Sequence, residues 1–171
     1  SPRNRKTASP AAKAAVDSRS IPMPGRVAIV ASCRTPFAKS GEVFKDLSAL
    51  DLAKVAVREL IERSEVDPKL IGSLVMGQVV ASVKAPNLAR ETGLGALLPK
   101  GVPAHTINRA CASSNQAIAD VASSILMGHI DVGVAGGAES LSSVPILHSK
   151  GMTAVLMAAS KAKGVGAQLG V

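Results

Sequence analysis

Apolar positions follow two different patterns along this chain, continuous runs and helical spacing. Residues 26–32 form a short, nearly continuous apolar run, which is typical of a strand covered on both faces. Ser48 and Asp51 then stand where an N-cap and a first-turn acid would stand. The apolar residues that follow recur at helical spacing, at Leu50, Ala53, Val57, Leu60 and Ile61. We therefore expect a strand at 26–32, then a helix that ends at Asp67-Pro68.

In the middle of the chain, the pattern of apolar and polar positions predicts further strands and helices. The strands are expected at 71–80, 104–108 and 131–135, with helices at 87–98 and 112–127 between them. Alternating strands and helices need crossover connections between parallel strands. We expect an α/β fold with a mixed, mostly parallel sheet and helices on both faces.

The predicted helix at 112–127 has an unusual composition. Asp120 is its only charged residue, and Ala and Ser make up much of the rest. A surface helix of this length normally carries a polar face, so we expect this one to be buried nearly all round, as a central layer between two sheets. One unit of about 120 residues does not normally supply two sheets, so the sequence predicts that a further layer covers this helix.

The length of 171 residues and an apolar content of 47% suffice for the core of one domain. The first 24 residues hold four prolines and, before Ile21, a single apolar residue larger than alanine, Val16, so residues 1–25 are expected to form a flexible basic extension. The α/β domain is expected at 26–146. No apolar stretch approaches the ~20 residues that cross a bilayer, which predicts a soluble protein.

The net charge of +8 lies at the two ends of the chain. Residues 1–26 carry a net +5 and residues 148–171 a net +3, which leaves 27–147 neutral. With no Tyr or Trp for base stacking, a nucleic-acid partner is not favoured. The two cysteines and three histidines lack the spacing of a disulfide framework or a metal site, which favours a reducing compartment.

Cys111 is the candidate nucleophile. It lies at the turn between the predicted strand at 104–108 and the predicted helix at 112–127. A cysteine there receives the positive end of the helix dipole and nearby backbone N–H groups, which stabilise a thiolate. The same N–H groups can stabilise the oxyanion of a tetrahedral intermediate. Position alone leaves open that Cys111 only fills space, because no base is identified.

Three segments together resemble the thiolase family. They are the cysteine segment Val102-Pro-Ala-His-Thr-Ile-Asn-Arg-Ala-Cys-Ala-Ser-Ser-Asn-Gln-Ala117, the glycine-rich segment Asp131-Val-Gly-Val-Ala-Gly-Gly-Ala-Glu-Ser-Leu-Ser-Ser-Val-Pro-Ile146, and the loop Arg34-Thr-Pro-Phe37. The resemblance covers about 26–163 in order. It is strongest to the 3-ketoacyl-CoA thiolase β subunit of fatty-acid oxidation trifunctional complexes.

The resemblance implies an acyltransferase that cleaves 3-ketoacyl-CoA with coenzyme A, or runs the reverse condensation. Cys111 would carry the acyl group as a thioester, and no metal or redox cofactor would be needed. Coenzyme A and acyl-CoA would be substrates, in a homodimer or tetramer that an α subunit of a β-oxidation complex could join. A bacterial cytoplasmic protein is expected, with the mitochondrial matrix as the alternative, since both compartments are reducing; whether it associates with a membrane is left open.

Length is the main departure from the family. A thiolase has two similar α/β halves, and its second half supplies two histidines and a further cysteine as acid and base. This chain is expected to be the N-terminal half, with 147–171 starting the loop domain and the second half absent. Two alternatives stay open: a β-ketoacyl synthase, whose active segment is similar, and a non-catalytic dimerising fragment.

The remaining candidate residues are assigned supporting roles. Cys33 and His105 are expected to pack structurally, and His129 to be exposed in a turn. His148 would start the loop domain. Asn108 and Arg109 are expected to brace the cysteine loop and a dimer interface without performing chemistry. Gly136-Gly137 lacks the pattern of a phosphate-binding loop, so it is interpreted as a tight turn where backbone passes closely.

Overall fold

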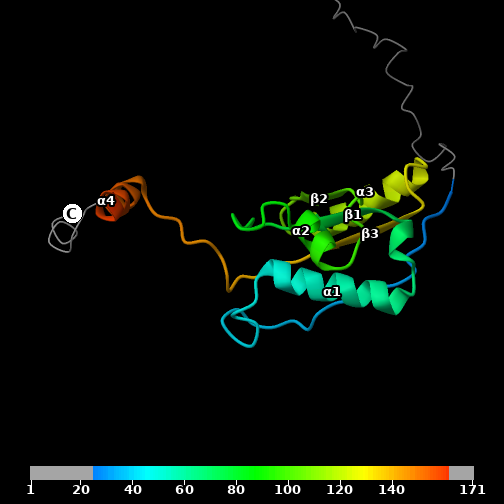
Figure 1. Ribbon diagram of the computed structural model, residues 1–171, viewed down its shortest axis with the longest axis horizontal. Helices are drawn as coiled ribbons and strands as arrows, with labels where there is room; N and C mark the ends of the chain where they lie inside the picture. The colour runs from blue at the N-terminus through cyan, green and yellow to red at the C-terminus, as the bar shows by residue number, and fades with distance from the viewer. Residues whose placement is uncertain (1–24, 162–171) are drawn as a thin grey trace, which may run out of the picture.

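A three-stranded parallel sheet with helices on both sides forms the body of the molecule (Figure 1). The computed structural model describes residues 25–161. The strands are β1 (Ile71–Gly77), β2 (Ala104–Ile107) and β3 (Val132–Gly137), in the order β2-β1-β3. The helices are α1 (Ala49–Ser64), the short 3-10 helix η2 (Pro68–Leu70), α2 (Leu88–Gly95), α3 (Ser113–Leu126) and α4 (Lys150–Lys161). The predicted α/β class is confirmed.

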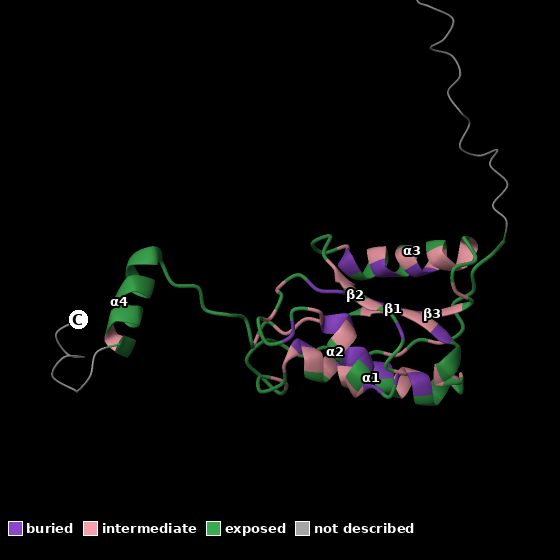
Figure 2. Ribbon diagram, turned by 45° about the horizontal axis from the view of Figure 1, so that its top comes forward, coloured by how far each residue is buried: buried purple, intermediate pink, exposed green. Residues whose placement is uncertain are grey.

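The central strand β1 is buried on both faces and divides the core in two. Leu74 and Met76 pack with the apolar faces of α1 and α2, whereas Val75 packs with Ala117 and Val121 of α3. Figure 2 shows α3 on one side of the sheet and α1 with α2 on the other. Helices on both faces are therefore confirmed, and the run of apolar residues in β1 follows from its double burial.

Helix α1 begins as its sequence predicts. The Ser48 hydroxyl accepts a hydrogen bond from the backbone N–H of Asp51, and the Asp51 carboxylate accepts one from the backbone N–H of Ser48, which is a complete capping box. The predicted end at Asp67-Pro68 is wrong. The helix ends at Ser64 because Glu65 takes a left-handed conformation with φ 55°, and the Asp67 carboxylate instead caps η2.

We expect the capping box to make the stability of the fold depend on pH. The hydrogen bonds from the Ser48 side chain and backbone hold the pKa of Asp51 below its ordinary value of 3.8. A carboxylate with a lowered folded-state pKa stabilises the fold above its ordinary pKa and loses that contribution as the pH falls through the folded value. Asp51→Asn should destabilise the protein by about 0.5 kcal/mol at neutral pH in urea unfolding. The gap to wild type should close below pH 3.8, and a gap that stays constant from pH 7 to pH 2.5 would contradict this.

The predicted strand at 26–32 is wrong. The segment is extended, but it joins no sheet, and Ile29 and Val30 are 78% and 79% exposed. A continuous apolar run of this kind suits an interior strand. In this sheet the interior position belongs to β1, whose two edges are paired with β2 and β3, so residues 26–32 do not occupy it.

The other predicted elements are confirmed, with bounds that differ by up to three residues. The paired residues of the strands end at Gly77, Ile107 and Gly137, so β1 and β2 end earlier than predicted and β3 ends two residues later. Asn87 caps α2, since its side-chain oxygen accepts from the backbone N–H of Arg90. Residues 1–24, where the flexible extension is expected, lie outside the described residues, so the predicted division into domains stays a prediction.

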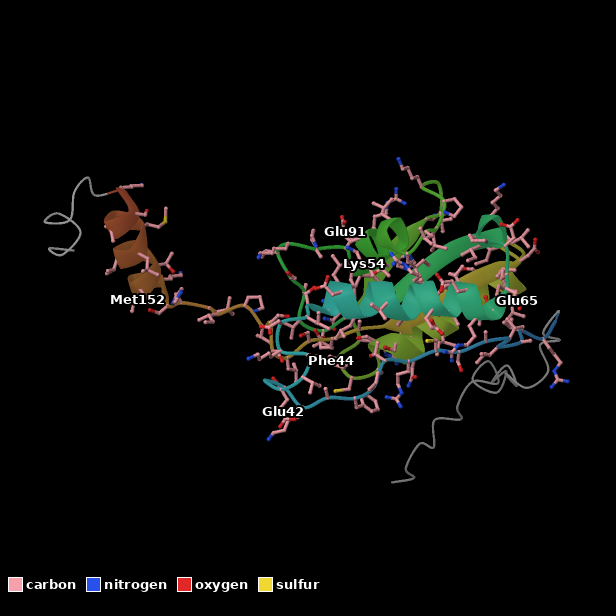
Figure 3. The ribbon with its side chains drawn as sticks, turned by 60° about the horizontal axis from the view of Figure 1, so that its bottom comes forward. Glu42, Phe44, Lys54, Glu65, Glu91 and Met152 are labelled. Atoms are coloured by element: carbon pink, nitrogen blue, oxygen red, sulfur yellow. The ribbon has the colours of Figure 1, made fainter. Side chains whose placement is uncertain are left out.

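Helix α4 stands apart from the sheet and its helices. Figure 3 shows Met152 on α4 at the end of an extended segment, whereas Lys54 of α1 lies beside α2. All the large apolar side chains of α4 are exposed: Met152, Val155, Leu156 and Met157. No helix within residues 25–161 has the length and apolar character needed to cross a bilayer.

Within the described residues, only one side of helix α3 is buried. Ser113, Ala117 and Val121 are buried against the sheet, whereas Ile118 on the outer side is 44% exposed. The predicted burial nearly all round needs a second layer, and the described part of the chain contains only the sheet beneath the helix. The small residues of α3 thus serve its close packing on β1 and β3.

Candidate active site

Cys111 lies in the short connection between β2 and α3, at the edge of the sheet where all three parallel strands end. Its thiol is free and exposed, and forms no hydrogen bond within residues 25–161. The carboxyl edge of an open parallel sheet is where ligands bind in folds of this kind. Cys111 is therefore placed where a substrate in solution can reach it.

A compact turn holds the backbone on either side of Cys111. The Ser113 hydroxyl accepts from the backbone N–H of Arg109 at 2.8 Å and donates to the carbonyl oxygen of Ala110 at 2.6 Å. The Asn108 side-chain oxygen accepts from the backbone N–H of Ala110 at 3.0 Å. Both backbone polar groups of Ala110 are thus bonded by side chains of the turn.

Ala110, the residue before Cys111, is held in a left-handed conformation. Its φ is 47°, a region that L-residues with a Cβ adopt at a cost of about 1–2 kcal/mol. Its two hydrogen bonds, to Asn108 and Ser113, offset this cost. Strain of this kind persists where the surroundings impose it, and it often accompanies a functional turn.

The amino end of α3, next to Cys111, has no side-chain cap. The N-cap is Ala112, and no side chain within the described residues bonds the first turn there. The N–H groups of Ala112 and Ser113 donate to the carbonyl oxygens of Arg109 and Ala110 at 3.1 Å, and the positive end of the helix dipole acts on whatever stands in front of it. Cys111 stands there, one residue before the N-cap, as its sequence position predicts.

Two glycines let the first turn of α3 approach the strand ends. A Cβ at Gly77 would come within 2.5 Å of the carbonyl carbon of Ser113 and 2.6 Å of the backbone nitrogen of Ser114. A Cβ at Gly137 would meet the Ser114 hydroxyl and, at 2.8 Å, the Gly77 carbonyl oxygen. The predicted close passage of backbone at Gly136-Gly137 thus holds for Gly137 alone, since nothing lies within 4 Å of a Cβ at Gly136.

Asn108 and Arg109 brace the cysteine loop, as the sequence predicts. The Asn108 side chain donates to the carbonyl oxygen of Val79 at 3.1 Å, and the Arg109 guanidinium donates to the Gln116 side chain at 2.6 Å. These bonds tie the loop to the end of β1 and to the second turn of α3. The predicted dimer interface at these residues stays a prediction.

The other candidates lie away from the Cys111 turn. Cys33 is half-buried in a cleft of about 430 Å³ lined by the 33–40 loop, α1 and residues 137–142, and Cys111 does not line it. His105 was expected to pack structurally, but it is exposed on the edge strand β2, because α3 covers mainly β1 and β3. His129 is exposed in a turn, as predicted, and His148 lies in the extended segment before α4. In the part of the chain that is described, no three His, Cys, Asp or Glu side chains gather as a metal site.

Glu139 makes a contact with the end of β1 that the sequence does not predict. Its carboxylate accepts from the backbone N–H groups of Val79 and Val80, just past the end of β1. The only sequence signal is its position two residues after the Gly136-Gly137 pair. A pairing over sixty residues cannot be deduced from a local pattern.

Known proteins resemble this chain along most of its length. Residues 27–171 match the family described as "Thiolase, N-terminal domain". The chain is 50% identical over 144 residues to proteins named 3-ketoacyl-CoA thiolase from a Shewanella species and from Vibrio cholerae, a match that covers 84% of this chain and 33% of each relative. It therefore spans about a third of the length of these relatives.

Two crystal structures show the same fold. The acetyl-CoA acetyltransferase of Bacillus anthracis superposes with a TM-score of 0.69 at 32% identity, over 72% of this chain and 31% of that one. The Acat5 thiolase of Ascaris suum, solved in complex with coenzyme A, gives 0.67 at 33% identity, over 71% of this chain and 32% of that one.

Proposed function

Because this chain belongs to the thiolase family and carries its N-terminal domain, we propose that it supplies the nucleophile for thiolysis of 3-ketoacyl-CoA. Cys111 attacks the 3-keto carbon and carries the shortened acyl group as a thioester. Coenzyme A then takes up that group, and the whole sequence is reversible. The two bacterial relatives named 3-ketoacyl-CoA thiolase support this reaction class.

The placement of Cys111 is the observation that carries the proposal. The exposed thiol stands at the uncapped end of α3, on a turn fixed by Asn108 and Ser113. A nucleophile needs both access to a ligand and a fixed backbone at that point. A cysteine that only fills space would be buried, as most free cysteines are.

The proposed chemistry balances over two half-reactions. In the first, the Cys111 thiol gives up its proton, its sulfur bonds to the keto carbon, and the bond between that carbon and the α-carbon breaks. The α-carbon takes the electron pair and a proton and leaves as acetyl-CoA. In the second, the coenzyme A thiol loses its proton and attacks the thioester, and Cys111 leaves with the electron pair and takes up a proton. The backbone N–H of Cys111 helps to stabilise the oxyanion formed at each attack.

Groups beyond this domain complete the proposed reaction. The acid and base that move the two protons are assigned to a second α/β half, since the chain spans about a third of its relatives. Coenzyme A and acyl-CoA are the proposed ligands, and thioester exchange at Cys111 itself needs neither a metal nor a redox cofactor. We further assign a homodimer or tetramer in the bacterial cytoplasm, which an α subunit of a β-oxidation complex could join.

A product assay tests the proposal. The protein that contains this domain, expressed from its complete reading frame, is incubated with a 3-ketoacyl-CoA and coenzyme A, and the CoA esters are separated by chromatography. We expect acetyl-CoA and an acyl-CoA two carbons shorter, in equal amounts and only when coenzyme A is added. Condensation that requires a malonyl thioester and releases carbon dioxide would instead identify a ketoacyl synthase. Neither reaction, from a folded protein, would favour a scaffold.

A further inference from the structure

The loop that follows β1 is held by hydrogen bonds to the chain near the ends of both neighbouring strands, β2 and β3. Gln78 continues the sheet pattern by donating its backbone N–H to the Ile107 carbonyl at 3.1 Å, and Ala138 donates to the Gly77 carbonyl at 3.2 Å. Beyond Gln78 no strand pairing continues. Side chains take over, and they come from the loops after β2 and after β3.

Glu139 holds this loop from the β3 side. Its Oε2 atom accepts from the Val79 N–H at 2.8 Å and from the Val80 N–H at 3.1 Å. Hydrogen bonds to an ionised acceptor are roughly twice as strong as neutral ones. Two of them on consecutive residues fix the direction in which the chain leaves β1, and therefore the direction of the Val79 carbonyl.

Asn108, which follows β2, binds the Val79 carbonyl oxygen from the other side. Its side-chain nitrogen donates to the Val79 oxygen at 3.1 Å, and its side-chain oxygen accepts from the Ala110 N–H at 3.0 Å. Ala110 is the left-handed residue directly before Cys111. A continuous path of hydrogen bonds thus runs from Glu139 through Val79 and Asn108 to the nucleophile turn.

We infer that Glu139 is a positioning residue for Cys111. It fixes the Val79 carbonyl, which orients the Asn108 amide, which in turn holds Ala110 in the conformation that sets Cys111 in front of α3. The geometry favours this role over direct acid or base chemistry, because the bonded Oε2 faces two backbone amides. The inference rests on the proposed role of Cys111 as the nucleophile.

Variants of Glu139 in the protein expressed from its complete reading frame test the inference. Glu139→Ala removes the acceptor, whereas Glu139→Gln keeps one oxygen, and a single oxygen makes both bonds here. Displacement of a reacting group by about 1 Å can cost up to 100-fold in rate, so we expect kcat of E139A to fall at least about tenfold with KM nearly unchanged. E139Q should stay within about threefold of wild type. Alkylation of Cys111 by iodoacetamide, followed by peptide mass spectrometry, should slow about fivefold in E139A only, because the thiol then moves away from its place in front of α3.

Ser140→Ala is the matched control. Ser140 is the neighbouring residue, and its hydroxyl donates to the Leu47 carbonyl and not to the β1 loop. S140A should keep both the kcat and the alkylation rate of wild type. If E139A does not fold, Glu139→Asp decides, because it keeps the charge but is too short to reach both amides, and it should show the same two losses.

Two results would overturn the inference: equal behaviour of E139A and S140A, or an equal loss in E139A and E139Q. A wild-type protein that forms no thioester at Cys111 would count against the proposed function instead. The alkylation rates would still report on the turn in that case.

Discussion

Replacement of Cys111 by alanine is expected to lower the rate of 3-ketoacyl-CoA thiolysis by about three orders of magnitude or more, since loss of a covalent nucleophile removes the intermediate itself. The fold should be retained. The side chain is exposed and unbonded, so alanine leaves neither a cavity nor an unpaired partner. Product analysis by chromatography measures the rate, and urea unfolding measures the stability, which should stay within about 0.5 kcal/mol of wild type.

Cys33→Ala is the matched control for that variant. Cys33 is the only other cysteine of the chain and lies half-buried in the cleft beside α1. Its replacement should leave the thiolysis rate within about twofold, because no step is assigned to it. Full activity in Cys111→Ala, or equal losses in the two variants, would remove Cys111 from the mechanism.

Replacement of Gly77 by alanine is expected to destabilise the protein by about 3 kcal/mol, the upper part of the range for overpacking a core. The new methyl group would stand 2.5–2.6 Å from backbone atoms of Ser113 and Ser114, and backbone cannot rotate away as a side chain can. The first turn of α3 must therefore lift off the sheet, and Cys111 moves with it. Urea unfolding gives the loss of stability, and the thiolysis rate should fall as well.

Gly136→Ala separates this steric cause from any general cost of replacing glycine. Gly136 lies in β3 next to Gly137, and nothing lies within 4 Å of a Cβ built there. Alanine should be neutral or slightly stabilising, because it loses less backbone entropy on folding than glycine does. Equal losses in Gly77→Ala and Gly136→Ala would show that close packing of α3 on the strand ends is not the reason for the glycine.

Local pattern predicted the elements whose causes are local. Helix α1 carries its capping box and its apolar spacing within twenty residues, so its beginning could be placed at Ser48. Its end could not, because Glu65 stops the helix by a left-handed conformation that its residue type does not announce. The segment at 26–32 failed for a related reason: its composition suits an interior strand, whereas pairing depends on which edges other strands have taken.

The candidate site was predictable at its centre and not in its supports. Position between a strand and a helix singled out Cys111, and resemblance to thiolases reinforced it. The contact of Gly77 with Ser113 and the bonds of the Glu139 carboxylate join segments more than thirty residues apart. Such contacts depend on which strands lie side by side in the sheet. The sequence of the chain alone does not give that arrangement. The left-handed Ala110 is held by Asn108 and Ser113, two and three residues away, but its residue type gives no sign of that conformation.

The most direct test of Cys111 as the acyl carrier is the mass of its peptide. The protein, expressed from its complete reading frame, is mixed with an acyl-CoA in the absence of free coenzyme A, quenched in acid, digested and measured. If Cys111 carries the acyl group, the peptide that contains it gains the mass of that group and loses it when coenzyme A is added before the quench. An unmodified Cys111 peptide, or an acyl group found on another residue, would show that Cys111 is not the acyl carrier.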